Sequence, residues 1–273
     1  MTVSQLTSRD NPLLKTIRLV SSGSKRAPEQ LVVAEGIRVL EEVNDSCHEI
    51  EAVVFSEHFG SVPREELLLE SWQSRGVHAY RVGEKLFASI SGVSAPQGAI
   101  ALVRVPALSL DRLPQPENAL ILYACGLQDP GNLGTLIRTA AAAGASAVCT
   151  TKGTVSARNP KALRASAGLF FCLPLVEHVE AVNFLDYCSS RAIRIFRTDA
   201  REGVLYTDAD LRLPCAILLG NEGSGMTGQE LFEFPSIRIP MAEGVESLNV
   251  AIAAAVILFE ASRQRRDKPR KQT

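Results

Sequence analysis

The sequence lacks the features that mark several protein classes. Only 5% of its 273 residues are aromatic, and its longest unbroken apolar run, Val250–Phe259, has ten residues, well short of the roughly 18 that a membrane helix needs. Its charges nearly cancel, to −1, so the chain as a whole is neither strongly basic nor strongly acidic. The composition indicates an ordinary globular protein and excludes coiled coil, collagen and low-complexity disorder.

Paired cysteines and a leader segment are also missing. The N-terminal residues Met1–Gln5 lack the charged start and apolar core of a secretory signal. We therefore expect a cytoplasmic protein with no membrane contact. We also expect no disulfide framework, no zinc site and no other metal centre, because no C-x-x-C pair occurs and buried reduced thiols are common in apolar surroundings. The six cysteines are Cys47, Cys125, Cys149, Cys172, Cys188 and Cys215.

A chain of this length suits two modest domains, because compact domains mostly have about 100–200 residues. Residues 108–118 contain two prolines and no helical or strand period, which predicts a linker between a domain 1–107 and a domain 119–273. In the first, short apolar runs alternate with helical periods, which indicates a small α/β domain. The runs and helical stretches are 31–34, 37–43, 50–55, 67–72 and 77–82.

The second domain shows the same alternation. Five short apolar runs predict strands at 120–124, 147–150, 193–197, 216–219 and 237–239, and helical periods predict helices at 133–143, 159–167, 179–189 and 248–265. This order is typical of a mainly parallel sheet covered by helices. Ligands of such sheets bind beyond the carboxyl ends of the strands, so the loops that follow the strands are the candidates for chemistry.

Residues 126–138 follow the strand predicted at 120–124 and open an Ala-rich helix. Glycines allow close backbone approach there, and amides at a helix N-terminus attract anions. Gly126 and Gly131 have the spacing of a Walker loop, but the Lys and Ser/Thr that should follow are absent, which excludes that nucleotide triphosphatase motif. Two structural explanations stay open: Asn132 as a helix cap and Arg138 as a plain surface residue.

Residues 218–228 contain a literal G-x-G-x-x-G, from Gly223 to Gly228. A dinucleotide-binding motif of this kind opens the first long helix of a βαβ unit. Here it comes late in the chain, and Phe234-Pro235 follows closely, leaving room for only about two helical turns. We interpret the motif as a coincidence and leave Glu222 open between a site residue and a solvent-exposed carboxylate.

Residues 239–250 end a strand, turn and enter the last helix. Ser247 is a good N-cap residue for that helix. Asn249 directly precedes the apolar run 250–259, and burying an amide without a partner costs about 1–3 kcal/mol. We therefore expect Asn249 to have a polar partner, which helix capping by Ser247 does not supply.

Together these loops resemble the three signature motifs of the SpoU/TrmH family of RNA ribose 2′-O-methyltransferases, in the SPOUT superfamily. The resemblance covers residues 119–265. Residues 8–15, 34–38 and 92–98 are similar to the substrate-binding domain that precedes the catalytic domain in many members. The motifs here are Asn132 with Arg138, Gly220-x-Glu222-Gly223, and Ile239-Pro240-Met241 with Ser247-Leu248-Asn249.

The resemblance implies a fold, a cofactor and an assembly. We expect a C-terminal SPOUT domain, an α/β fold with a mainly parallel sheet and a deep trefoil knot, preceded by a small α/β RNA-binding domain. Topology rules alone would not give the knot, because knots are nearly absent from proteins. The expected cofactor is S-adenosylmethionine, and the expected assembly is a homodimer. The positions that match cofactor-binding loops are Gly220, Ile239, Leu248 and Asn249.

The same resemblance implies the catalytic residues. Arg138 matches the essential arginine of the family. A guanidinium is a poor base because its pKa exceeds about 12, so we assign Arg138 an electrostatic role, anchoring phosphate and stabilising developing alkoxide charge. We assign orienting hydrogen bonds to Glu222 and Asn249. The candidate catalytic set is Arg138, Asn132, Glu222, Ser247 and Asn249.

Charge clusters indicate where RNA binds. Residues 1–38 carry six Lys/Arg against three Asp/Glu and residues 263–273 carry six against one, whereas residues 41–70 carry one against nine. Basic clusters attract phosphates. Since members with such an N-terminal domain often act on large-subunit RNA, we expect 23S ribosomal RNA rather than transfer RNA as the substrate. The candidate phosphate contacts are Arg9, Asn11, Lys15, Lys25 and Arg26.

Three alternatives remain. The first is a transfer RNA ribose 2′-O-methyltransferase. The second is an RNA-binding protein of the same fold that does not methylate, against which the complete set of five polar site residues argues. The third is a nicotinamide oxidoreductase that uses Gly223–Gly228, against which the short space before Phe234 argues.

Overall fold

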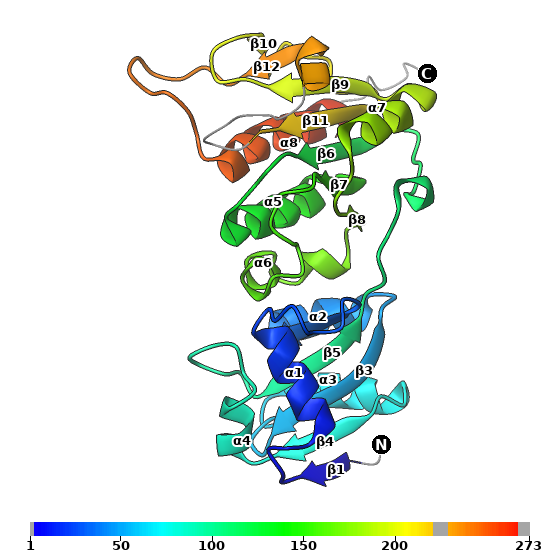
Figure 1. The fold of residues 1–273 in the computed structure, drawn as a ribbon, viewed down its shortest axis with the longest axis vertical. Coiled ribbons are helices and arrows are strands. Elements are labelled where there is room, and N and C mark those ends of the chain that lie inside the picture. Colours follow the sequence, from blue (N-terminus) through cyan, green and yellow to red (C-terminus); the bar gives the residue numbers. More distant parts are fainter. Residues whose placement is uncertain (1–2, 221–228, 267–273) are drawn as a thin grey trace. The chain divides into compact units, whose positions relative to one another are not determined.

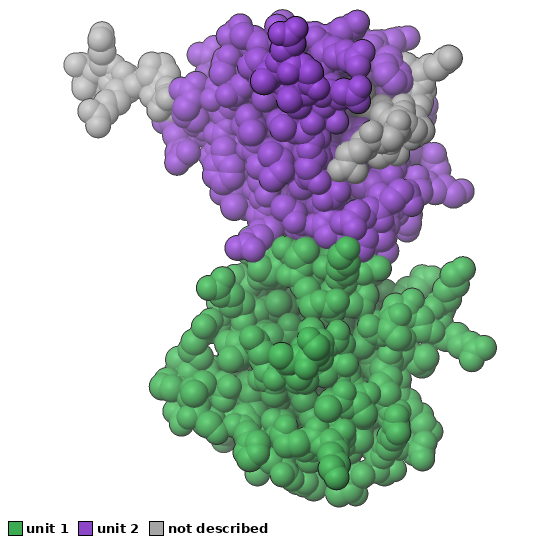
Figure 2. Space-filling model, turned by 90° about the vertical axis from the view of Figure 1, so that its left-hand side faces the viewer, with its two compact units in different colours: residues 1–107, 158–172 green, residues 108–157, 173–273 purple. Residues whose placement is uncertain are grey.

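The computed structural model describes residues 3–220 and 229–266, and the chain forms two compact units (Figure 2). The first unit comprises residues 1–107 together with 158–172, and the second comprises 108–157 and 173–273. Thus a segment from the C-terminal half of the sequence belongs to the first unit. Across the described ranges, no helix has both the length and the apolar character of a membrane span.

The first unit is built on a five-stranded mixed sheet in the order β1-β4-β3-β5-β2 (Figure 1). β5 runs antiparallel to β2 and β3, and β4 runs parallel to β1 and β3. The strands are β1 (Val3–Leu6), β2 (Leu31–Glu35), β3 (Glu49–Ser56), β4 (Ala79–Val82) and β5 (Ala99–Arg104), and the helices are α1 (Pro12–Ser21), α2 (Ile37–Asp45), α3 (Pro63–Ser74), α4 (Glu84–Ala88), α6 (Pro160–Ala165) and the 3-10 turn η2 (Leu169–Phe171).

Helices α1 and α4 pack on one face of this sheet. Their apolar side chains share a core with Val54, Ile100 and Leu102, and α2 and α3 contribute no residue to that cluster. α2 instead contacts α3, β2, β5 and η2. The close packing of η2 on α2 needs a glycine at position 168, where φ is +92° and an added Cβ would lie 2.7–3.1 Å from Glu42 and Val39.

The second unit has a seven-stranded sheet in the order β10-β12-β9-β11-β6-β7-β8, and every pair in it is parallel (Figure 1). The strands are β6 (Leu120–Ala124), β7 (Ala147–Thr150), β8 (Leu175–Val176), β9 (Arg194–Thr198), β10 (Val204–Leu205), β11 (Cys215–Leu219) and β12 (Ser236–Arg238), and the helical segments are η1 (Leu110–Arg112), α5 (Pro130–Ala143), α7 (Ala181–Ser190), η3 (Gln229–Glu233) and α8 (Val250–Arg266).

β11, the central strand of this sheet, and its neighbour β6 are buried along their whole length, as expected for parallel strands with helices on both faces. On one face, α7 packs on a cluster in which the Tyr123 ring stacks on Phe184, with centroids 4.2 Å apart. α5 and α8 pack against each other and contribute nothing to that cluster.

Three helices begin with an Asx-Pro pair, and the side chain of the Asx residue caps the helix. Asn11 accepts a hydrogen bond from the Leu13 N–H, and Asn159 accepts one from the Lys161 N–H. Asp129 caps α5 in the same way. A proline is well tolerated at the first helical position because its missing N–H would have no partner there. These pairs fix where α1, α5 and α6 start.

The mainly parallel α/β fold expected from the sequence is confirmed. The strands expected at 120–124 and 147–150 have those bounds, whereas the last helix begins at Val250 rather than at 248. The expected knot stays a prediction, because residues 221–228, which connect β11 to η3, lie outside the described residues.

Candidate active site

The loop after β6 is held at the carboxyl edge of the parallel sheet by backbone and hydroxyl contacts. Gly126 has φ +66°, a conformation that side-chain-bearing residues rarely adopt. Its N–H donates to the hydroxyls of Thr151 and Thr154, each 3.0 Å away. The Cys125 N–H donates to the Leu219 carbonyl at 2.8 Å. The loops after β6, β7 and β11 therefore meet at one edge.

Asn132 lies in the first turn of α5, but it is not the cap of this helix. The cap is Asp129, whose carboxylate accepts the Asn132 backbone N–H at 2.8 Å. The interpretation of Asn132 as a cap is therefore wrong. Because Asp129 caps the helix, the side chain of Asn132 is not needed for that task.

The side chain of Asn132 contacts Asn249, at the start of α8. The Asn249 Nδ2 donates to the Asn132 Oδ1 at 2.9 Å. The Asn249 Oδ1 accepts the backbone N–H groups of Ala251 and Ile252, at 2.9 and 3.3 Å. The expected polar partner of Asn249 is thus Asn132. The cap of α8 is Asn249 rather than Ser247, because the helix begins two residues later than the sequence indicated.

Other candidate residues lie around this amide pair. Ser247 is exposed, and Leu248 is half-buried. Arg138 is exposed on α5, six residues after Asn132. Six residues take an α-helix through about one and two-thirds turns, so Arg138 leaves α5 on a different side from Asn132. Among the described residues, a hydrogen bond joins Asn132 to Asn249, whereas no hydrogen bond joins either of them to Arg138.

The cofactor positions fall at the ends of two strands. Gly220 directly follows β11, and Ile239 directly follows β12. Both are half-buried, as is Leu248. β9 separates the two strands in the sheet. Glu222, also a candidate, and the glycines at 223 and 228 lie outside the described residues.

Sequence reasoning missed two groups at this edge. Thr151 and Thr154 hold the Gly126 amide, and the Thr-rich segment after the 147–150 strand was the signal for them. Asp199 follows β9 and accepts hydrogen bonds from the backbone N–H groups of Arg201 and Glu202. Burial raises the pKa of Asp199, but these bonds and the Arg197 guanidinium outweigh it and hold the pKa below its usual value.

The thiols near the edge are poor nucleophiles. Burial raises the pKa of Cys125 to about 12, and it also raises the pKa of Cys149. A thiol with such a pKa is almost entirely protonated near neutral pH. Across residues 3–220 and 229–266, no group of three His, Cys, Asp or Glu side chains is placed to hold a metal ion.

Two family models match the chain. The SpoU rRNA Methylase family matches residues 119–259, and the MRM3-like substrate binding domain matches residues 11–101. The first match covers the whole edge described above, from β6 into α8. The chain belongs to the SpoU rRNA methylase family. The resemblance inferred from the three motifs is confirmed.

Relatives in the SpoU rRNA methylase family cover almost the whole chain. A tRNA/rRNA methyltransferase of Synechocystis is 31% identical over 96% of this chain and 94% of its own. The 23S rRNA (guanosine(2553)-2′-O)-methyltransferase of Bacillus subtilis is 28% identical over 93% of this chain and 98% of its own. An AdoMet-bound rRNA methyltransferase from Sinorhizobium meliloti superimposes with a TM-score of 0.83 at 30% identity, over 96% of this chain and 98% of its own.

The candidate RNA contacts all lie in the first unit. Arg9, Lys25 and Arg26 are exposed. Lys15 forms an exposed ion pair with Asp10, 3.0 Å away. Asn11 caps α1, so part of its hydrogen-bonding capacity is used within the protein.

Proposed function

We propose that this protein transfers a methyl group from S-adenosylmethionine to a ribose 2′-hydroxyl of 23S ribosomal RNA. The observation that carries the proposal is the hydrogen bond between Asn132 and Asn249, which joins the first and third family motifs at the carboxyl edge of the parallel sheet. Support for the substrate comes from the relatives, which are named as ribosomal RNA methyltransferases in Bacillus subtilis and Sinorhizobium meliloti.

The residues at this edge suit S-adenosylmethionine, which the Sinorhizobium meliloti relative holds. Gly220 has no side chain, so a ligand can approach its backbone closely. Ile239 and Leu248 offer half-buried aliphatic side chains, which suit the flat apolar face of an adenine. When bound, the cofactor supplies a methyl group that its sulfonium already activates. Gly220, Ile239, Leu248 and Asn249 are the residues proposed to hold it.

The remaining task of the protein is to position a ribose oxygen and to stabilise the negative charge that develops on it. Proximity and alignment supply a large share of the acceleration in such transfers. Arg138 is exposed on α5 and is proposed to contact the RNA phosphate and stabilise the charge on the oxygen. Asn249 and Asn132 fix the loops that surround the reacting atoms, and Glu222 and Ser247 complete the polar set.

We also propose that the working form is a homodimer. α8 has two large apolar side chains exposed on the same side, seven residues apart: Ile252 is 52% exposed and Phe259 is 47% exposed. Residues at this spacing share one face of a helix. Exposed apolar side chains on a helix whose other side is buried against α5 favour contact with a second copy.

The test is tritiated methyl transfer from S-adenosylmethionine to separated ribosomal and transfer RNA pools, both prepared from a strain that lacks the protein. We expect label in 23S RNA at a 2′-oxygen, mapped by resistance of the adjacent phosphodiester to alkali. Label confined to transfer RNA would show that the substrate is transfer RNA rather than 23S RNA. Cofactor binding without label in either pool would favour an RNA-binding protein that does not methylate.

A further inference from the structure

The first unit has a groove in which only one of the candidate RNA contacts, Lys15, lies. It is open, with a volume of about 730 Å³, and lies between α1 and the turn at 89–92. α1 lines it with Lys15, Arg18 and Leu19, and the remaining lining residues are Ser21, Ser22, Ser89, Ile90, Ser91 and Gly92. No carboxylate and no aromatic ring is among the residues that line it.

The turn at 89–92 is fixed by the edge strand of the sheet. Glu35, at the end of β2, accepts hydrogen bonds from the Ser91 hydroxyl and, at 2.9 Å, from the Gly92 N–H. A few residues along, the Gln97 side chain accepts the Ile37 N–H at the start of α2, at 2.8 Å. The segments 34–38 and 92–98, singled out from the sequence, thus hold each other. The carboxylate of Glu35 is engaged by these donors.

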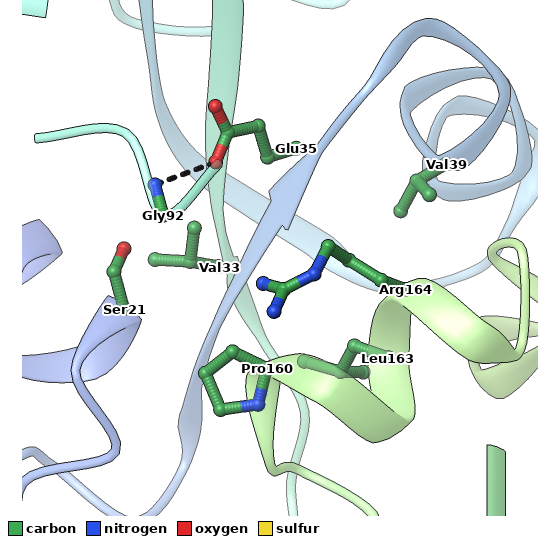
Figure 3. A pocket seen from close by; sticks show the side chains of 8 residues that line it. All are labelled: Ser21, Val33, Glu35, Val39, Gly92, Pro160, Leu163 and Arg164. Atoms are coloured by element: carbon green, nitrogen blue, oxygen red, sulfur yellow. Dashed lines mark hydrogen bonds between the residues drawn. The ribbon is translucent and has the colours of Figure 1, made fainter. Parts of the chain in front are cut away.

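A second, smaller pocket adjoins the groove and shares Ser21 and Gly92 with it. Its volume is about 20 Å³, room for roughly one water molecule. Val33 and Glu35 of β2 and Val39 of α2 line it on one side. Pro160, Leu163 and Arg164 of α6 line it on the other, so α6 packs beside β2 (Figure 3).

Arg164 therefore reaches the end of the groove from the C-terminal half of the sequence. In Figure 3 its guanidinium extends from α6 toward β2, with Ser21 across the pocket. A Cβ added to Gly92 would lie 3.7 Å from both the Arg164 Nη1 and the Glu35 Oε2, and 3.9 Å from the Ser21 Cβ, so these four residues meet there. The Ser21 hydroxyl is buried and has no hydrogen-bond partner among the described residues.

We propose that this groove binds phosphodiester groups of the RNA, with Arg164 of α6 completing it. Lys15 and Arg18 lie one helical turn apart on one wall, and Arg164 lies in the adjoining pocket, next to Gly92 at the end of the groove. The ion pair of Lys15 with Asp10 is exposed and therefore weak, so a phosphate can displace it. The inference rests on the proposed function: the RNA that binds this groove of the first unit is the substrate of the proposed methyl transfer.

The chemistry of the lining also indicates how the RNA is held. Proteins that read single-stranded bases stack them on aromatic rings, and this groove offers none. Cations and hydroxyls contact phosphates, which position an RNA without reading its sequence. The groove therefore anchors the RNA backbone, and base preference arises elsewhere.

The experiment is fluorescence anisotropy of the full-length chain with a fluorescein-labelled oligouridylate about twelve nucleotides long, over a series of salt concentrations. The variants are Lys15→Gln and Arg164→Gln. The matched control is Arg64→Gln, which removes the same charge from α3, where Arg64 pairs with Glu41 outside the groove. We expect weaker binding for each groove variant, with a salt slope smaller by about 0.7 for each lost phosphate contact, and an unchanged slope for the control.

Unchanged affinity and slope in both groove variants would overturn the inference, as would an equal loss in the Arg64→Gln control. Thermal unfolding of each variant verifies that the fold is kept. Methyl transfer to 23S RNA by the wild-type chain separates the two proposals. If the wild-type chain transfers methyl and the groove variants bind normally, only the groove is wrong. If the wild-type chain transfers none, the proposed function is wrong whatever the binding result.

Discussion

The side-chain amide of Asn249 donates a hydrogen bond to the side-chain oxygen of Asn132 at 2.9 Å, although 117 positions of sequence separate them. The same Asn249 caps α8 with its oxygen. One residue therefore performs two tasks that substitution can separate: it stabilises the start of a helix, and it joins that helix to the first turn of α5.

Substitution at Asn249 separates these tasks. Serine retains a capping oxygen but is too short to reach Asn132, whereas alanine loses both contacts. We expect Asn249→Ala to lower the free energy of unfolding by about 1 kcal/mol more than Asn249→Ser, and both to slow methyl transfer to a similar extent. Urea unfolding and single-turnover transfer measure the two effects. Wild-type transfer by Asn249→Ser would show that the bridge to Asn132 is not needed.

Arg138 is the residue whose loss should affect chemistry without affecting the fold. It is exposed on α5, so Arg138→Ala should leave the unfolding temperature and cofactor affinity near wild-type. Methyl transfer should fall by about a hundredfold or more, the usual cost of removing a donor that stabilises developing negative charge. Thr135→Ala, at an exposed position of the same helix, is the control. Equal loss of cofactor binding would make Arg138 a cofactor ligand instead.

The exposed side of α8 makes the homodimer testable. Ile252→Glu combined with Phe259→Glu places two charges on the apolar face and should convert a dimer to monomers in sedimentation equilibrium. The control is Val182→Glu on α7, because Val182 is 61% exposed and lies on another helix. A double variant that sediments like the wild-type chain would exclude this face of α8 as the interface.

Cys172 should react slowly with alkylating reagents although it is exposed. Burial of its sulfur and the hydrogen bond it donates to Glu42, 3.1 Å away, raise its pKa to about 12. The thiol therefore stays protonated until the pH approaches that value. Glu42→Gln removes the negative charge and should increase iodoacetamide labelling of Cys172 at pH 8, measured by peptide mass spectrometry. Labelling of Cys47, also exposed, should stay unchanged.

Arg265 fixes the C-terminal end of α8. We expect Arg265→Lys to lower the free energy of unfolding by about 2 kcal/mol, because an ammonium group cannot reproduce several directed bonds of a guanidinium. Arg266→Lys is the control, since Arg266 is exposed and bonds only weakly to Ser262 within the same helix. Similar losses in both variants, measured by urea unfolding, would contradict the prediction. The guanidinium of Arg265 donates to the carbonyls of Asn118, Ala119, Leu211 and Leu213.

The parallel sheet was predictable because its strands carry unbroken apolar runs. β6 and β7 have the expected bounds, and both are buried throughout. β1 was not predicted, because three of its four residues are exposed and it lies at the edge of its sheet. An edge strand with few buried side chains carries little hydrophobic pattern. Periodicity therefore identified the buried strands and the half-buried edge strand β2, but not an edge strand that is mostly exposed.

The contacts of the candidate site could be predicted only in part. The need of Asn249 for a partner followed from its position before an apolar run, whereas its partner Asn132 is too distant in sequence to be deduced from spacing. The expected cap at Ser247 was wrong. Ser and Asn cap helices about equally well, so residue type could not distinguish Ser247 from Asn249, two positions later. The roles of Arg138 and Ser247 in catalysis stay predictions.

The position of residues 158–172 in the sequence limits how the first unit can be exchanged between relatives, by recombination or by design. These residues come after β7 in the sequence but belong to the first unit, where α6 contacts β2 and Gly168 packs on α2. The first unit is therefore not a single exchangeable module. A chimaera joined at residue 107 would combine a substrate-binding unit with another protein's version of this segment, so recombination between relatives must exchange two stretches of the gene together.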